Sequence, residues 1–193
     1  MAVPESMTTL DISGEFIMDK TLSDDSDEIL RLQGVSWFTR RAISMATVYL
    51  TIKHDKTAEG VEHIVIDQVL TGGLGGSTEE RTLDWQERET SQPLFGPVLG
   101  RSRRIKLEEL EDEYLKNGWL PDVTEHGAIQ AIAQSDTAKS GRVWYSEQVF
   151  GFEEINGERR QTRHVHFIGP EQEDIHVRFV YDYQGPLDET PSS

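Results

Sequence analysis

The sequence contains no cysteine, which excludes both a disulfide framework and a thiolate metal site. Basic residues are also scarce: 19 Lys and Arg stand against 35 Asp and Glu, giving a formal net charge of −16. A surface with this charge repels phosphate backbones and anionic membranes, so we expect no nucleic-acid partner.

No stretch approaches the roughly 20 apolar residues of a membrane span. Residues 1–10 have neither a basic start nor an apolar run. We therefore expect a cytoplasmic protein without stable membrane insertion.

Several catalytic motifs are missing as well. The glycine-rich stretch 71–77 is not followed by the Lys-Ser/Thr step and helix of a phosphate loop, which excludes nucleotide binding of that kind. No Ser-His-Asp order and no Gly-x-Ser-x-Gly elbow stands out. A hydrolase of the usual serine type is therefore not indicated.

Alternating apolar and polar residues dominate what is present. In residues 47–53, Val48, Leu50 and Ile52 share one face of a predicted strand. Asn156-Gly157 is a strong hairpin signal, because both residues tolerate positive φ. Further strands are predicted over residues 61–70, 80–87, 95–107, 128–134, 142–155, 159–168 and 174–183. Strands joined by short turns predict a mainly β protein, an up-and-down antiparallel β-barrel of about 8–10 strands.

Two helical segments interrupt this pattern. Between the first two strands, an acidic-fronted helix, a Gly34-Val35 break and a second helix are predicted, and together they are typical of a lid. An extra short helix is expected near 107–117, with Asn117-Gly118 as its stop. We expect a flexible N-terminal arm over 1–10, one barrel domain over 11–185 and a disordered tail over 186–193.

The first quarter of the chain resembles the intracellular fatty-acid-binding proteins, within the wider calycin group that includes the lipocalins. The residues that carry the resemblance are Ile12-Ser13-Gly14-Glu15-Phe16, then Asp27-Glu28-Ile29-Leu30 and Leu32-Gln33-Gly34-Val35-Ser36-Trp37-Phe38-Thr39-Arg40. The resemblance implies a helix-turn-helix lid over a barrel that holds a hydrophobic small molecule. The predicted helix near 107–117 departs from that family's pattern.

The resemblance also implies an anchor for the ligand. In the family the last strand carries Arg-x-Tyr, which clamps a ligand carboxylate, whereas this strand has Phe179-Val180-Tyr181. If Tyr181 and Tyr183 point inward, Phe179 does too, and the clamp lacks its arginine. We expect either a ligand without a free acid or a different arginine, with Arg103 as the first substitute. An outer-face position that balances the many carboxylates is the competing interpretation of Arg103.

The remaining candidates are aromatic and basic residues that would line the interior. Core packing explains the tryptophans equally well, and the helix dipole explains Arg41. The expected ligand-binding set is Trp37, Arg41, Trp85, Arg103, Trp144, Phe179, Tyr181 and Tyr183.

Histidines are the other chemical signal. His164 and His166 share one strand face, and His176 is expected on the neighbouring strand. Such a cluster can bind a metal or transfer protons near neutral pH, but a solvent-facing pair is the simpler interpretation. With no matched third ligand visible, we assign no metal and no cofactor.

Two functions follow. The first is binding of a hydrophobic small molecule, such as a lipid or a polyketide- or terpenoid-like compound, in the barrel cavity. The alternative is a lipocalin-like enzyme, a cyclase, isomerase or dehydratase acting on a hydrophobic natural-product intermediate. In that case His164, His166 and Tyr181 are the catalytic candidates.

Overall fold

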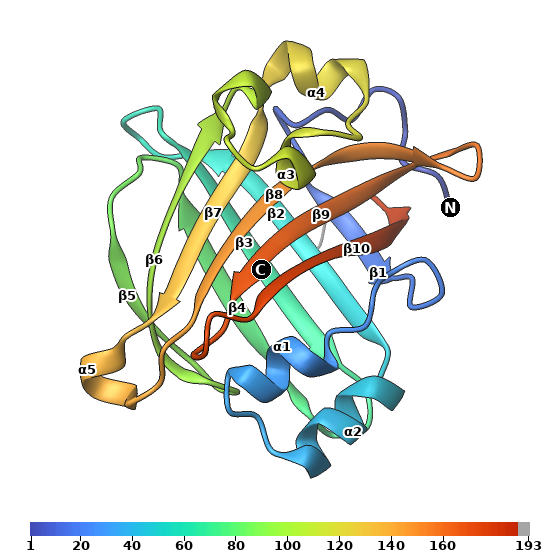
Figure 1. The fold of residues 1–193 in the computed structure, drawn as a ribbon. Coiled ribbons are helices and arrows are strands. Elements are labelled where there is room, and N and C mark those ends of the chain that lie inside the picture. The colour runs from blue at the N-terminus through green and yellow to red at the C-terminus, as the bar shows by residue number, and fades with distance from the viewer. Residues whose placement is uncertain (189–193) are drawn as a thin grey trace.

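Ten antiparallel strands form a nearly closed barrel in the computed structural model, which describes residues 1–188 (Figure 1). The sheet order is β4-β3-β2-β1-β10-β9-β8-β7-β6-β5, so strands that follow each other in sequence pair, except that β4 and β5 form the two edges, and β1 joins β10. The strands are β1 Gly14–Met18, β2 Val48–Lys56, β3 Glu62–Leu70, β4 Gly75–Thr82, β5 Arg88–Gln92, β6 Gly96–Ile105, β7 Ala128–Ser135, β8 Tyr145–Ile155, β9 Glu158–Ile168 and β10 Asp174–Gly185. This architecture confirms the expected up-and-down barrel.

Alternation along the strands separates core from surface, as β2 illustrates. Val48, Leu50 and Ile52 are buried and Tyr49 and Thr51 are exposed, as the period of two requires.

The predicted hairpin between β8 and β9 is also present. Asn156 (φ 53°) and Gly157 (φ 78°) both adopt the left-handed conformation that a two-residue turn of this kind needs.

The segment around the glycines differs from the prediction. The expected strand 80–87 is instead the end of β4 followed by a turn, in which Trp85 has φ 62° and its N–H donates to the Ser102 carbonyl at 2.9 Å. The strand starts earlier because Gly75 and Gly76 pair with β3. At Gly76 a Cβ would lie 2.5 Å from the Gln68 carbonyl oxygen, so only glycine permits this approach.

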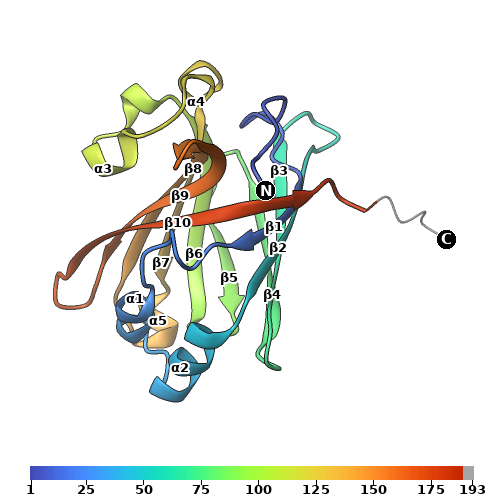
Figure 2. The same cartoon turned by 90° about the vertical axis from the view of Figure 1, so that its right-hand side faces the viewer.

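The two lid helices, α1 Asp27–Leu32 and α2 Trp37–Met45, lie together at one end of the barrel (Figures 1 and 2). Gly34, at φ 84°, ends the first helix, and the Ser36 side chain caps the second by accepting from the Thr39 N–H. The first helix buries Ile29 and Leu32, whereas the second buries none of its side chains.

The other end of the barrel is covered by an insertion, Leu107 to His126, between β6 and β7 (Figure 2). The single helix expected near 107–117 is divided into a 3₁₀ turn, Leu107–Glu109, and a short helix, α3 Glu113–Lys116. The division arises because Leu110 is extended and buried in the core, after which Asp112 caps α3. A further helix, α4 Pro121–His126, was not predicted, and α5 Thr137–Ser140 follows β7.

Residues 1–10, expected to form a flexible arm, pack against the barrel. Val3 is 3% exposed, and its N–H donates to the Arg159 carbonyl at 2.8 Å. Thr9 is fully buried and its hydroxyl donates to the Gly127 carbonyl at 2.6 Å. Residues 1–10 are therefore held against the barrel by contacts that their sequence does not reveal.

Of the predicted tail, residues 189–193 lie outside the described part of the chain. Within residues 1–188, no helix is long and apolar enough to cross a membrane.

Candidate functional site

A cavity of about 470 Å³ opens between the lid helices and the barrel interior. Both lid helices line it, through Ile29 and Leu30 of α1 and Arg40 and Ile43 of α2. The volume lies within the range of roughly 300–1,000 Å³ typical of small-molecule sites. The lid therefore covers a hollow of suitable size, as the helical pattern predicted.

Apolar and aromatic side chains from several strands form much of the wall. They include Val48 of β2, Leu70 of β3, Val165 of β9 and Phe179 of β10, with Phe95 from the turn before β6. Such walls favour a ligand with a large apolar surface, because burial stabilises it by about 25 cal/mol per Å².

Arg163 is the most unusual polar residue of this cavity. It lines the cavity from β9 yet is only 6% exposed. Its guanidinium carbon lies 4.5 Å from the ring centroid of Phe150 and 4.9 Å from that of Tyr181, which fixes its orientation through cation–π contacts. Its Nε and Nη2 atoms are buried and have no hydrogen-bond partner among the described residues. Unpaired buried donors are costly, so Arg163 is an unusual group to find on this wall.

Glu79 is the counter-charge to Arg163. From β4 it lines the same cavity, and its Oε2 accepts from Arg81 Nη2 at 2.7 Å. Burial raises the pKa of Glu79, but the positive charges of Arg81 and Arg163 outweigh that effect and hold the pKa below its ordinary value. Glu79 is therefore an ionised carboxylate inside the barrel.

Tyr181 completes this polar group. Burial raises the pKa of its phenol, so at neutral pH the hydroxyl keeps its proton and can donate it in a hydrogen bond. A second cavity of about 130 Å³ shares Glu79 and Gln148 with the larger one. Glu79, Arg163 and Tyr181 thus form a polar cluster beside the apolar wall of the larger cavity.

Three of the eight expected ligand-binding residues line one of the two cavities, and the other five line neither. Phe179 and Tyr181 line the larger cavity, and Trp144 lines the smaller one. Tyr183 packs edge-on against Phe16 in the core, with ring centroids 5.5 Å apart.

The other four expected residues line neither of these two cavities. Trp37 is 60% exposed on α2, next to the exposed Arg41. Arg103 stacks on Trp85 with 4.0 Å between the guanidinium carbon and the ring centroid, and its Nε donates to Gln130 at 2.7 Å. Arg103 therefore has partners of its own, and its binding role stays a prediction.

The candidate histidines lie on the other face of β9 and β10, under the insertion. His164 Nε2 is 2.9 Å from Glu153 Oε2, and its Nδ1 is 2.9 Å from the Tyr114 carbonyl oxygen. His166 and His176 stack on each other, with ring centroids 4.2 Å apart. Neither His164 nor His166 lines either of the two cavities, since alternation sends Arg163 and Val165 inward and the histidines outward.

Sequence reasoning missed Arg163 and Glu79. Arg163 pairs in register with Phe179, the position where the resemblance led us to look for an arginine. An arginine therefore lies level with Phe179, on the adjacent strand rather than on the last one. The signal was available in the sequence, because Arg163 alternates with the histidines of the same strand and so had to face the opposite side.

Comparison with known proteins identifies full-length relatives and structural neighbours. No family model matches the chain. The chain is 32% identical over 189 residues to "Probable pericyclase scpY" of Mollisia scopiformis, with 96% of each chain covered. It is 30% identical over 196 residues to "Pericyclase pydY" of Acremonium sp, covering 96% of this chain and 98% of the relative.

Solved structures with similar folds include a REP1-NXSQ fatty acid transporter (TM-score 0.51, 14% identity, 90% of this chain and 96% of that chain). Fatty-acid-binding protein 1 of Echinococcus granulosus has a TM-score of 0.50 at 13% identity, with 89% of this chain and 96% of that chain covered. The fluorescent protein UnaG has a TM-score of 0.51 at 12% identity, with 90% and 97% covered. These neighbours show that the fold is the fatty-acid-binding-protein-like barrel of the calycin group. The full-length sequence similarity shows that the chain belongs to the same family as the pericyclase pydY and the probable pericyclase scpY.

Proposed function

We propose that this protein is a pericyclase that closes a ring in an unsaturated, hydrophobic natural-product intermediate held in the cavity between the lid and the barrel. The observation that carries the proposal is the similarity over 96% of the chain to two proteins named as pericyclases. The lidded apolar cavity supports it, because such a chamber suits an oily, flexible substrate.

A pericyclic reaction makes modest demands on side-chain chemistry. In an intramolecular cycloaddition of a diene with an alkene, two C–C σ bonds form while two C=C π bonds are lost, and no proton or electron enters or leaves. The principal task of the enzyme is therefore to fold a linear chain so that the reacting carbons meet. Holding reactants in such a geometry accounts for a large part of catalysis in general.

Arg163 adds an electronic contribution in this mechanism. A carbonyl group conjugated to the reacting alkene would accept from the guanidinium of Arg163, which lines the cavity. The guanidinium donors withdraw electron density from the alkene, which lowers the barrier for reaction with an electron-rich diene. Because the guanidinium is already fixed against Phe150 and Tyr181, little reorganisation is needed at the moment of reaction.

Binding without reaction is the second candidate function. The similarity of the fold to a fatty acid transporter and a fatty-acid-binding protein favours it. In that case Arg163 would hold the polar group of a ligand that leaves unchanged. The two functions differ in whether a product forms.

A synthetic linear polyene that carries a diene and a conjugated enone is a suitable probe. Incubated with the protein, it should give an isomer of identical mass, with a new chromatographic retention time and one dominant enantiomer. Arg163→Gln should reduce kcat/KM by roughly 10²-fold, comparable to the loss of one preorganised oxyanion donor. Chiral liquid chromatography with mass spectrometry measures both results.

Arg103→Gln is the matched control, since Arg103 bonds to Gln130 outside the two cavities and should leave turnover unchanged. Circular dichroism must show that both variants are folded. Equal turnover by the Arg163→Gln variant and the wild type would refute the role of Arg163. Tight binding of the probe with full recovery of unreacted material would favour the binding protein instead.

A further inference from the structure

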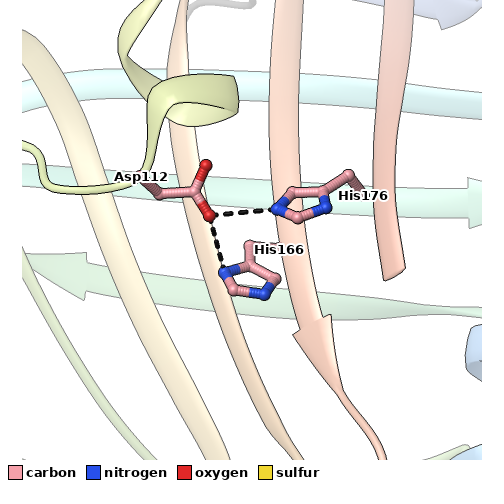
Figure 3. Close-up of side chains that lie close together, drawn as sticks. All are labelled: Asp112, His166 and His176. Carbon is pink, nitrogen blue, oxygen red and sulfur yellow. Dashed lines mark hydrogen bonds and ion pairs between the residues drawn. The ribbon is translucent and has the colours of Figure 1, made fainter. Parts of the chain in front are cut away.

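A cluster of two histidines and an aspartate lies on the outer face of β9 and β10, away from the cavity (Figure 3). His166 of β9 and His176 of β10 are register partners, and their rings stack with centroids 4.2 Å apart. Asp112, from the insertion, reaches both rings through one oxygen atom. Its Oδ2 is 2.8 Å from His166 Nδ1 and 3.0 Å from His176 Nε2.

The geometry of these three atoms is close to that of a metal site. One ligand atom from each residue lies within 4.8 Å of the other two. Bonds of 2.0–2.1 Å around a tetrahedral zinc ion separate adjacent ligand atoms by about 3.3 Å. The separations of 2.8 and 3.0 Å from Asp112 Oδ2 need a small expansion to accommodate the ion, and the two histidines each place a ring nitrogen within 4.8 Å of the other.

Surrounding groups hold the three ligands in place. The Asp112 Oδ1 atom accepts from the N–H groups of Tyr114 and Leu115 as the cap of α3, which leaves Oδ2 directed at the histidines. On the far side of the His166 ring, Nε2 is 2.8 Å from Asp174 Oδ1. A carboxylate on the second nitrogen of a ligating histidine fixes its tautomer and makes it a better ligand.

The electrostatic setting also favours a cation. Two carboxylates flank the histidine pair, and the whole chain carries a formal net charge of −16. Two imidazoles and one carboxylate are ligands that zinc accepts readily, with a water molecule in the fourth position. The three residues are 19% to 34% exposed in their side chains, so an ion can reach them from solvent.

We propose that Asp112, His166 and His176 bind one zinc ion, which ties the insertion to strands β9 and β10. This site is separate from the cavity and from the proposed cyclisation. Its ligands come from two distant regions of the sequence, since Asp112 and His176 are 64 residues apart. Binding would therefore stabilise the folded chain, in which alone the three residues meet.

Titration of tag-free protein with Zn²⁺ in competition with a chromogenic chelator tests the proposal at pH 7.5. We expect one tight site per chain and a rise in the thermal unfolding midpoint with zinc concentration. Asp112→Asn, His166→Gln and His176→Gln should each weaken binding by more than about tenfold, because even supporting residues around a metal contribute that much. Asparagine also caps helices, so Asp112→Asn should keep α3 intact.

His63→Gln is the matched control, since His63 also faces an aspartate, Asp55 at 3.4 Å, but lies outside the cluster. It should bind zinc as tightly as the wild type. Cobalt(II) should give the visible spectrum of a tetrahedral ion in the wild type and the control only. Zinc binding by the wild type that is no tighter than binding by His166→Gln would overturn the proposal. None of these measurements depends on turnover in the cavity.

Discussion

Arg163 and His164 are adjacent in the sequence but face opposite sides of β9. Arg163 lines the cavity, and its buried Nε and Nη2 have no partner within residues 1–188, whereas His164 lies under α3 with both ring nitrogens close to oxygen atoms. A backbone carbonyl only accepts, so His164 Nδ1 must donate to Tyr114. Burial raises the pKa of Glu153, but the hydrogen bonds from His164 and Thr162 outweigh it and hold the pKa below its usual value. An ionised carboxylate therefore lies buried against the His164 ring.

His164→Ala should destabilise the protein without slowing its reaction. The substitution removes the His164 ring, whose Nε2 lies 2.9 Å from Oε2 of Glu153, a side chain that is 7% exposed. Taking a hydrogen-bond partner away from a buried group costs about 1–3 kcal/mol of unfolding free energy. Urea unfolding measures that loss, and turnover of the polyene probe by the folded fraction should be unchanged.

Arg178→Gln is the comparison for His164→Ala. Arg178 Nη1 is 3.6 Å from Glu153 Oε1 and its side chain is 36% exposed, so its loss should cost no more than about 1 kcal/mol. Equal losses for the two variants would contradict a stabilising contact between His164 and Glu153. A large fall in turnover for His164→Ala would instead support the catalytic role expected from the sequence.

The strand face on which a side chain lies was easier to predict than the segment that covers that face. The alternation that places Phe179 and Tyr181 on one face was readable, and both line the cavity. The sequence could not show that the insertion covers the outer face of β9. A solvent-facing position was therefore the simpler interpretation of His164. Contacts between segments so far apart leave no local pattern.

The insertion between β6 and β7 is the element that distinguishes this chain from the expected barrel. It packs through Trp119, whose ring stacks on His164 with centroids 4.1 Å apart. Trp119 also lies over Gly151 of β8, where a Cβ would meet ring atoms at 2.8 and 2.9 Å. The backbone of Gly151 is ordinary, so glycine is needed there for space rather than for conformation.

Gly151→Ala should therefore displace the insertion and destabilise the fold by about 1–3 kcal/mol, the usual cost of overpacking. Chemical unfolding followed by tryptophan fluorescence measures the change. In a Trp119→Ala background the same substitution should cost much less, because the clashing ring is gone. A full, undiminished cost in that background would show that Trp119 is not the cause.

Elements with a strong local pattern were predictable, and those without one were not. The lid helices and the β8–β9 hairpin follow from caps, glycines and alternation. The helix near 107–117 divides at Leu110 because burial of that side chain in the core outweighs the helical period. Helix α4 has only six residues, too few for a periodic signal.

The whole molecule combines a strong negative charge with several stabilised carboxylates. Burial raises the pKa of Glu62, but hydrogen bonds from His54 and Arg104 lower it overall to about 2. The pKa of Glu153 and that of Asp112 are also lowered. In the unfolded chain these groups bind protons more readily, so folding depends on their remaining ionised.

Stability should therefore pass through a maximum as the pH falls from neutral. Between pH 7 and the isoelectric point near 4.7, the net charge of −16 shrinks and self-repulsion weakens, which favours the folded state. Below about pH 4.5, the ordinary value for glutamate, the depressed carboxyls lose their contribution progressively toward pH 2. Urea midpoints measured across this range should rise and then fall, and added salt should raise the midpoint at pH 7. A midpoint that is independent of salt at pH 7 would contradict the repulsion argument.

The two ends of the sheet, β4 and β5, face each other without sharing a ladder in the described residues. Because no main-chain hydrogen bonds join these two edge strands, the diameter of the barrel is not fixed there. The edges can move apart and come together again. Ring closure turns an extended chain into a compact one of different width. In the proposed cyclisation, a chamber with such a seam can follow the change in shape of its substrate and release the product.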